Sequence, residues 1–153
     1  MGQSNYLKAQ IPGNLLSFFM KLSHNLERSE PMMRIADSYR KIRQHIDLLA
    51  KEAGRDPAEI ILLAVSKTHP WEQLKSAYDA GCRDFGESKI QEALPKIENA
   101  PHDIRWHMIG TLQKNKVRKA VGSFSLIHSV DNFELARKIS EVSEEMGVIT
   151  HLL

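Results

Sequence analysis

Lys67 follows the most apolar run of the chain, which extends from Ile60 to Val65 and ends with Ser66. A lysine at the end of a buried strand is partly removed from water, and this desolvation lowers the pKa of its amine. An unprotonated amine is a nucleophile that forms a Schiff base with an aldehyde. The pattern therefore predicts a reactive lysine at position 67. The plain alternative is a solvated lysine that only marks the end of a strand.

Strands and helices alternate around Lys67. Helices are indicated by apolar residues at three- and four-residue steps, and strands by short apolar runs. The predicted helices occupy 35–53, 70–80, 89–99, 112–121 and 132–146, with Ser88 and Asp131 as the N-caps of the third and the fifth. The predicted strands occupy 60–67, 83–87, 104–109, 124–130 and 148–153.

This alternation predicts an α/β fold with a parallel sheet covered by helices. Two architectures fit it: a doubly wound open sheet, or the first half of a (β/α)8 barrel of the TIM type, holding about five parallel strands. Two details favour the barrel. The last strand runs to the end of the sequence, and Lys67-Thr68-His69-Pro70 has none of the glycines of a phosphate-binding loop after a first strand.

Composition bounds the class of protein. The chain has 153 residues, 42% hydrophobic and 26% charged, as in an ordinary soluble domain. Its net charge of +2 gives no electrostatic case for nucleic acid as the main partner. The single cysteine, Cys82, excludes an internal disulfide framework and predicts a packed thiol in a reducing, cytoplasmic setting. No apolar run approaches the ~20 residues that span a bilayer, so no membrane partner is expected.

Residues 1–33 give no regular pattern and are expected to be an extension of uncertain structure, before a domain at 34–153. Their serines and the absence of acids before Glu27 are weak features of an organelle transit peptide. Arginine is absent before Arg28, however. We therefore favour a disordered or misassigned upstream extension, with the true start at Met32 or Met33.

Four motifs resemble one known family in their order and spacing. They are LLAVSKT at 62–68, DFGESKIQEA at 84–93, WHMIGTLQKNK at 106–116 and IHSVD at 127–131. Together they resemble the pyridoxal-phosphate homeostasis proteins, also called the YggS or PROSC family. The resemblance extends from about residue 35 to the end of the chain.

The resemblance implies a barrel similar to the N-terminal domain of alanine racemase, with pyridoxal 5′-phosphate as its cofactor. Lys67 matches the family lysine that forms a Schiff base with the cofactor. Family members hold and deliver the reactive aldehyde without robust catalysis, so the chain is expected not to be an enzyme. PLP-dependent apoenzymes would be recipients of the cofactor.

Strand parity and the resemblance together suggest further cofactor-binding positions. Lys67 is in phase with Val65 and Leu63, whose face is expected to point into the barrel. By resemblance, His107 and Ile109 approach the cofactor from the third strand. The alternative for His107 is a core histidine whose hydrogen bonds are satisfied inside the protein.

Two serines complete the predicted site. Ser88 stands where many relatives carry asparagine in a Phe-Gly-Glu-Asn pattern, so its shorter side chain weakens the expected bond to the ring hydroxyl. Its alternative role is the N-cap. Ser129 ends the fourth strand, where functional groups of barrels gather. The alternative for Ser129 is a turn residue before the Asp131 cap.

Other functions remain as alternatives. A weak racemase-like enzyme would need a base across the ring, and no tyrosine or cysteine is identified for that role. An interaction module would use the basic helix at 112–121, but a solvated outer helix is the favoured explanation of its charges, because the rest of the chain is neutral. The seven histidines include no His-x-x-x-His pair, so no metal is expected.

The resemblance also implies that the chain is truncated. Relatives continue for several more βα units, which carry the phosphate-binding loops and the group that faces the pyridine nitrogen. A half barrel would keep the lysine, lose most of the phosphate affinity and self-associate through its open edges.

Overall fold

The computed structural model describes residues 31–153, so residues 1–30 of the predicted extension lie outside the described part. The last three residues of that extension belong to the first helix. The helices are α2 (Pro31–Glu52), α3 (Trp71–Asp79), α4 (Ile90–Asn99), α5 (Val117–Ala120) and α6 (Phe133–Met146), with short 3-10 helices η1 (Pro57–Glu59) and η2 (Lys114–Lys116). The strands are β1 (Ala64–Val65), β2 (Asp84–Glu87), β3 (Arg105–Met108) and β4 (Leu126–Ile127).

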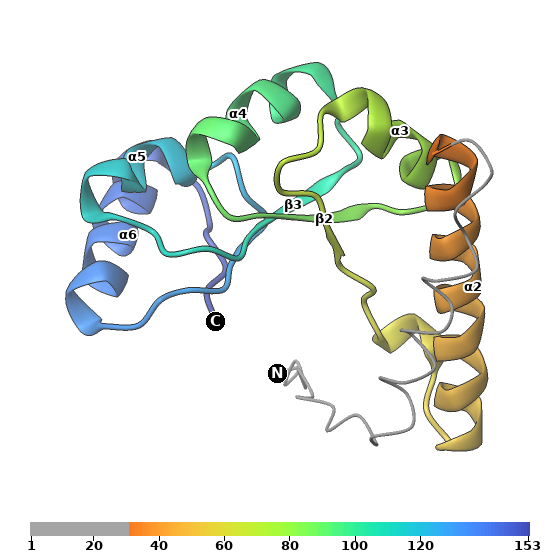
Figure 1. The fold of residues 1–153 in the computed structure, drawn as a ribbon. Coiled ribbons are helices and arrows are strands. Elements are labelled where there is room, and N and C mark those ends of the chain that lie inside the picture. The colour runs from red at the N-terminus through yellow and green to blue at the C-terminus, as the bar shows by residue number, and fades with distance from the viewer. Residues whose placement is uncertain (1–30) are drawn as a thin grey trace.

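The four strands form one parallel sheet in the order β1-β2-β3-β4. Each strand therefore pairs with the next one along the chain. Both common doubly wound orders contain a switch point, and the described strands have none. Helices α3 and α4 lie on one side of the strands, with α2 at one end of the arc and α5 and α6 at the other (Figure 1).

The predicted fifth strand is reduced to a single parallel bridge between Ile127 and Leu152. The main chain nevertheless pairs there, since the Ile127 N–H donates to the His151 carbonyl and the Leu153 N–H donates to the Ile127 carbonyl, each at 3.0 Å. The chain thus continues the order of the sheet beside β4.

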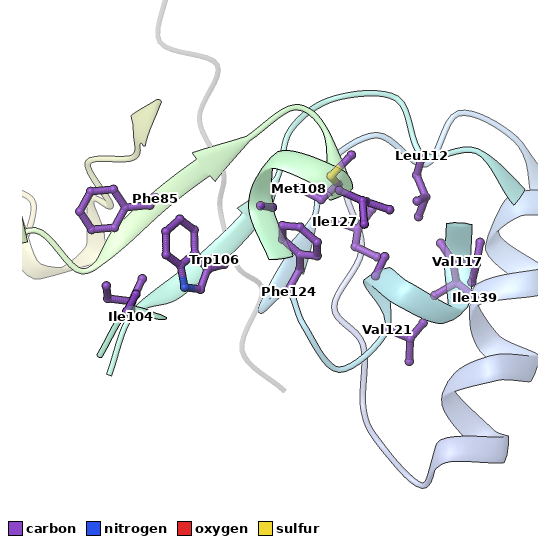
Figure 2. Close-up of a cluster of buried hydrophobic side chains, with 14 of the residues drawn as sticks. Phe85, Ile104, Trp106, Met108, Leu112, Val117, Val121, Phe124, Ile127 and Ile139 are labelled. Atoms are coloured by element: carbon purple, nitrogen blue, oxygen red, sulfur yellow. The ribbon is translucent and has the colours of Figure 1, made fainter. Parts of the chain in front are cut away.

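The core lies between the sheet and its helices. Phe85, Trp106, Met108 and Ile127 alternate with residues of the other sheet face and are at most 4% exposed. Figure 2 shows these side chains in a continuous cluster, which reaches Ile139 of α6. Fully burying a side chain of this size stabilises the fold by about 1.5–3 kcal/mol.

Several local predictions are wrong by one residue or by one turn. Lys89, not Ser88, is the N-cap of α4, and it makes no side-chain cap bond. Asn132, not Asp131, caps α6, because its side chain accepts from the Leu135 N–H at 2.8 Å. The basic helix expected at 112–121 consists only of η2 and the four residues of α5.

The predicted packing of Cys82 is confirmed, because this residue is fully buried. Burial raises the pKa of its thiol to about 11. Among the described residues, no helix is both long and apolar enough to cross a membrane.

Candidate functional site

Lys67 lies in a tight turn directly after β1. The Ser66 carbonyl accepts from the His69 N–H at 3.2 Å, which closes the turn with Lys67 and Thr68 at its two central positions. Lys67 is exposed, and its side chain makes no ion pair or hydrogen bond with another described residue. The expected desolvation of Lys67 is therefore wrong, because β1 ends before Ser66 and the turn raises the lysine into solvent.

Thr68 holds this turn in a strained conformation. Its φ of 68° is in the left-handed region, and it is the single residue other than glycine described there. A β-branched side chain is disfavoured in that region, at a cost of roughly 1–3 kcal/mol. Such a conformation persists only where the surrounding structure enforces it.

A buried polar network lies below the turn. Glu87, at the end of β2, is fully buried, and one of its carboxylate oxygens accepts from the Ser66 hydroxyl at 2.5 Å and from the Lys96 ammonium at 2.7 Å. The Lys96 ammonium, which comes from α4, also donates to the Ser66 carbonyl at 2.9 Å. The second Glu87 oxygen, Oε2, is buried and accepts no hydrogen bond from the described residues.

Gly110 brings the two predicted serines to one place. The Ser129 hydroxyl donates to the Gly110 carbonyl. A Cβ on Gly110 would lie 2.2 Å from the Ser88 carbonyl oxygen, so the end of β3 passes directly against the backbone after β2. Gly110 was not among the predicted site residues, although a glycine directly after a strand is a signal of close backbone approach.

The predicted parity of the strands is confirmed. Val65 pairs with Gly86, and Gly86 pairs with His107, so these three residues share the sheet face opposite the core. Ile109 is on this face as well, because its Cδ1 would lie 3.1 Å from a Cβ on Gly86. Val65 is 53% exposed there, which leaves this face open next to β1.

His107 is buried, and both of its ring nitrogens are already hydrogen bonded. Nε2 lies 3.0 Å from Asp84 Oδ1, and Nδ1 lies 2.9 Å from His128 Nε2. Arg105 donates to both oxygens of Asp84, at 2.8 and 2.6 Å. His107 thus matches the alternative of a satisfied core histidine, and only the face and edges of its ring remain for contact with a ligand.

Two pKa values in this cluster are shifted. Burial alone would raise the pKa of Asp84, but hydrogen bonds and charge from His107 and Arg105 outweigh burial and lower it. Burial, followed by the nearby charge of His107, lowers the pKa of His128. Neither Asp84 nor His128 was predicted as a site residue. The available signal was a charged residue inside β2, in phase with His107.

The parallel strands place the candidate residues at one edge of the sheet. Lys67, Ser88 and Ile109 each follow the carboxyl end of a strand, and Ser129 follows β4. Among residues 34–153, no group of three or more His, Cys, Asp or Glu side chains is arranged to hold a metal ion.

Curated proteins with similar sequences share one name. The chain is 52% identical over 93 residues to the pyridoxal phosphate homeostasis protein of Synechocystis, an alignment that covers 60% of this chain and 43% of that protein. Identity to the proteins of the same name is 46% over 111 residues in Pseudomonas aeruginosa and 39% over 114 residues in Escherichia coli. Each alignment covers 72% of this chain, and 48% and 49% of the respective relative. No family model matches the chain.

Solved structures give the same relationship. PipY of Synechococcus elongatus with PLP bound has a TM-score of 0.60 at 39% identity, with 77% of this chain and 52% of PipY covered. A protein of unknown function from Bifidobacterium adolescentis has a TM-score of 0.74 at 30% identity, with 82% and 56% covered. In sequence and in fold, the chain is related to the pyridoxal phosphate homeostasis proteins and spans about half the length of the curated relatives it matches.

Proposed function

We propose that the chain binds pyridoxal 5′-phosphate through Lys67 and serves intracellular PLP homeostasis as a carrier, without robust catalysis. The observation that carries the proposal is the exposed Lys67 in a strained turn at the carboxyl end of a parallel sheet. The relatives named for this function, and PipY with PLP bound, support it. Lys67 would hold the cofactor through its amine, since PLP would supply an aldehyde that forms a Schiff base with a lysine amine with release of water.

The residues present fit an aldehyde ligand. The Lys67 amine is solvent-accessible and is not engaged by another described residue, so nothing has to be displaced before it reacts. Ser88 no longer serves as a cap, which leaves its hydroxyl for a ligand. His107 and Ile109 would offer ring and aliphatic surface, and Ser129 would fix the Gly110 carbonyl beside them.

The proposal includes the architecture. The described sheet would be the first half of a (β/α)8 barrel, with residues 34–153 as its domain and the face of Val65 and Gly86 turned inward. The sequential strand order and the helices on one side of the sheet support this (Figure 1). Self-association through the open face would appear as a sedimentation mass above 17.4 kDa.

The proposed role is that of a cytoplasmic carrier and not of an enzyme. A racemase requires a second base across the ring from the lysine, whereas the carrier role requires only the lysine. The PLP-dependent apoenzymes proposed as recipients would take the aldehyde from an accessible lysine. Turnover of L- or D-alanine above the rate given by free cofactor would contradict the carrier role.

The test is to mix the chain with PLP, reduce with borohydride and map the adduct. A stable adduct confined to Lys67, and absent from Lys67→Met, would support the proposal. Lys75→Met is the matched control, because Lys75 is an exposed lysine paired with Asp79 on α3. Scattered labelling that is unchanged in Lys67→Met would refute the proposal.

A further inference from the structure

We infer that Lys96 and Glu87 are positioning residues that set the turn of Lys67. The inference rests on the proposed function, because it concerns how this lysine is presented to an aldehyde. Neither side chain reaches the exposed surface where Lys67 lies: the side chain of Glu87 is 0% exposed and that of Lys96 is 11% exposed. Both act on the peptide that precedes Lys67.

Ser66 forms one hydrogen bond with each of these two side chains. The Lys96 ammonium binds the Ser66 carbonyl, and the Glu87 carboxylate binds the Ser66 hydroxyl, so the residue is fixed through its main chain and its side chain. The same Ser66 carbonyl closes the turn by accepting from the His69 N–H. A shift of Lys96 would therefore release one of the two bonds that orient the turn.

The strain at Thr68 gives independent support. A threonine keeps a φ of 68° only if the surrounding contacts hold it, and the turn has such contacts on both sides of Lys67. Before Lys67, Ser66 is held by the Lys96 ammonium and the Glu87 carboxylate. On the side after it, the Thr68 main chain interacts with the carboxylate of Glu92, another residue of α4.

Helix α4 thus acts as the support for the turn after β1. Its residue Lys96 reaches Ser66, and its residue Glu92 reaches Thr68, on either side of Lys67. A reacting group held on a rigid support is already oriented when its partner arrives, which lowers the entropy cost of reaction. A lysine on a loose loop would react with PLP as any surface lysine does.

The experiment compares Lys96→Met with the double variant Lys96→Met/Glu87→Gln. The single change leaves the buried Glu87 carboxylate without its cation and destabilises the fold. The double change removes both charges, so that stability recovers toward that of the parent chain. The Ser66 carbonyl still lacks its ammonium donor in the double variant, so the turn stays released.

Two readouts follow the turn. In the chain without PLP, amide hydrogen exchange of the peptide spanning 66–69 is expected to speed up in the double variant. With PLP and borohydride, half-maximal labelling of Lys67 is expected to need on the order of 10- to 100-fold more PLP. Lys96→Arg keeps a cation, so it is expected to bring the exchange at 66–69 and the PLP concentration for half-maximal labelling part of the way back to the values of the parent chain. Lys75→Met is expected to change neither quantity.

The outcomes separate the two ideas. If the parent chain gives no adduct confined to Lys67, the proposed function fails. If the parent chain is labelled at Lys67 and the double variant is labelled within about threefold of the same PLP concentration, with unchanged exchange at 66–69, the positioning role is overturned and the proposed function stands.

Discussion

Substitution of Gly110 by alanine is expected to be the most damaging single-methyl change at the predicted site. A Cβ there would lie 2.2 Å from the Ser88 carbonyl oxygen and 2.7 Å from its Cα, whereas ordinary contact begins at 3.4 Å. These neighbours are backbone atoms, so no side-chain rotation relieves the overlap. The end of β3 and the chain after β2 would have to move apart by about 1 Å, which is overpacking without an adaptable neighbour.

The loss of stability can be worked out from the hydrogen bond that this movement breaks. The Ile109 N–H donates to the Glu87 carbonyl at 2.9 Å, and this ladder bond joins the two segments that must separate. Overpacking costs about 1–3 kcal/mol, and losing a hydrogen bond costs about 0.5–1.5 kcal/mol. We therefore expect Gly110→Ala to lower the free energy of unfolding by about 3 kcal/mol, a large part of the ~5–15 kcal/mol of a typical domain.

Gly86→Ala is the matched control. Its Cβ would meet the Ile109 Cδ1 at 3.1 Å and the Leu63 Cδ2 at 3.4 Å, and both are ends of flexible side chains. We expect a change below about 1 kcal/mol, because these side chains can give way. Urea unfolding followed by circular dichroism measures both variants. Equal stability of the two variants, or a loss below about 1 kcal/mol in Gly110→Ala, would refute the reasoning.

Three other predictions concern charge and exposure. Lys67→Met should change the free energy of unfolding by less than about 0.5 kcal/mol, because the side chain is exposed, and a larger loss in urea titrations would show a structural role. The pKa values of His128 and Asp84 are lowered in the folded state, so the unfolded chain binds more protons and acid destabilises the fold. The contribution of His128 to the free energy of unfolding is lost as the pH falls below the ordinary histidine pKa of 6.5. The contribution of Asp84 is complete above its ordinary pKa of 3.8 and is lost as the pH falls through its lower folded-state pKa. Urea titrations at a series of pH values should show the loss due to His128 in the parent chain and not in His128→Asn. The same dependence of the free energy of unfolding on pH in both chains would show that His128 is not its source. The pKa of Cys82 rises from 9.0 to about 11 on folding, so stability should fall between those pH values, by about 2–3 kcal/mol in total, and Cys82→Ala should remove that loss.

The sequence was most informative where apolar residues repeat regularly within one helix or one strand. Short apolar runs predicted strands at 83–87 and 104–109, close to the observed β2 and β3, and apolar residues at three- and four-residue steps predicted a helix at 132–146, close to α6. The caps were misplaced because neighbouring residues compete for one role. Asp131 and Asn132 are both good caps, and only the path of the chain decides between them.

Interactions between elements were beyond reach of the sequence. The partners Asp84 and His107 are 23 residues apart, and Glu87 and Lys96 belong to a strand and a helix whose relative rotation no local pattern specifies. The exposure of Lys67 was misjudged for a related reason. An apolar run shows that a strand is buried somewhere, but the register with β2 decides where the pairing stops.

The sequential order of the strands has a consequence for synthesis on the ribosome. Each strand pairs with the next one to emerge, and paired residues are separated by only about 20 positions, such as Ala64 and Phe85. At typical elongation rates a new partner strand leaves the tunnel every few seconds, roughly. The nascent chain can therefore add one βα layer at a time, and each of β2, β3 and β4 finds the preceding strand already available for pairing.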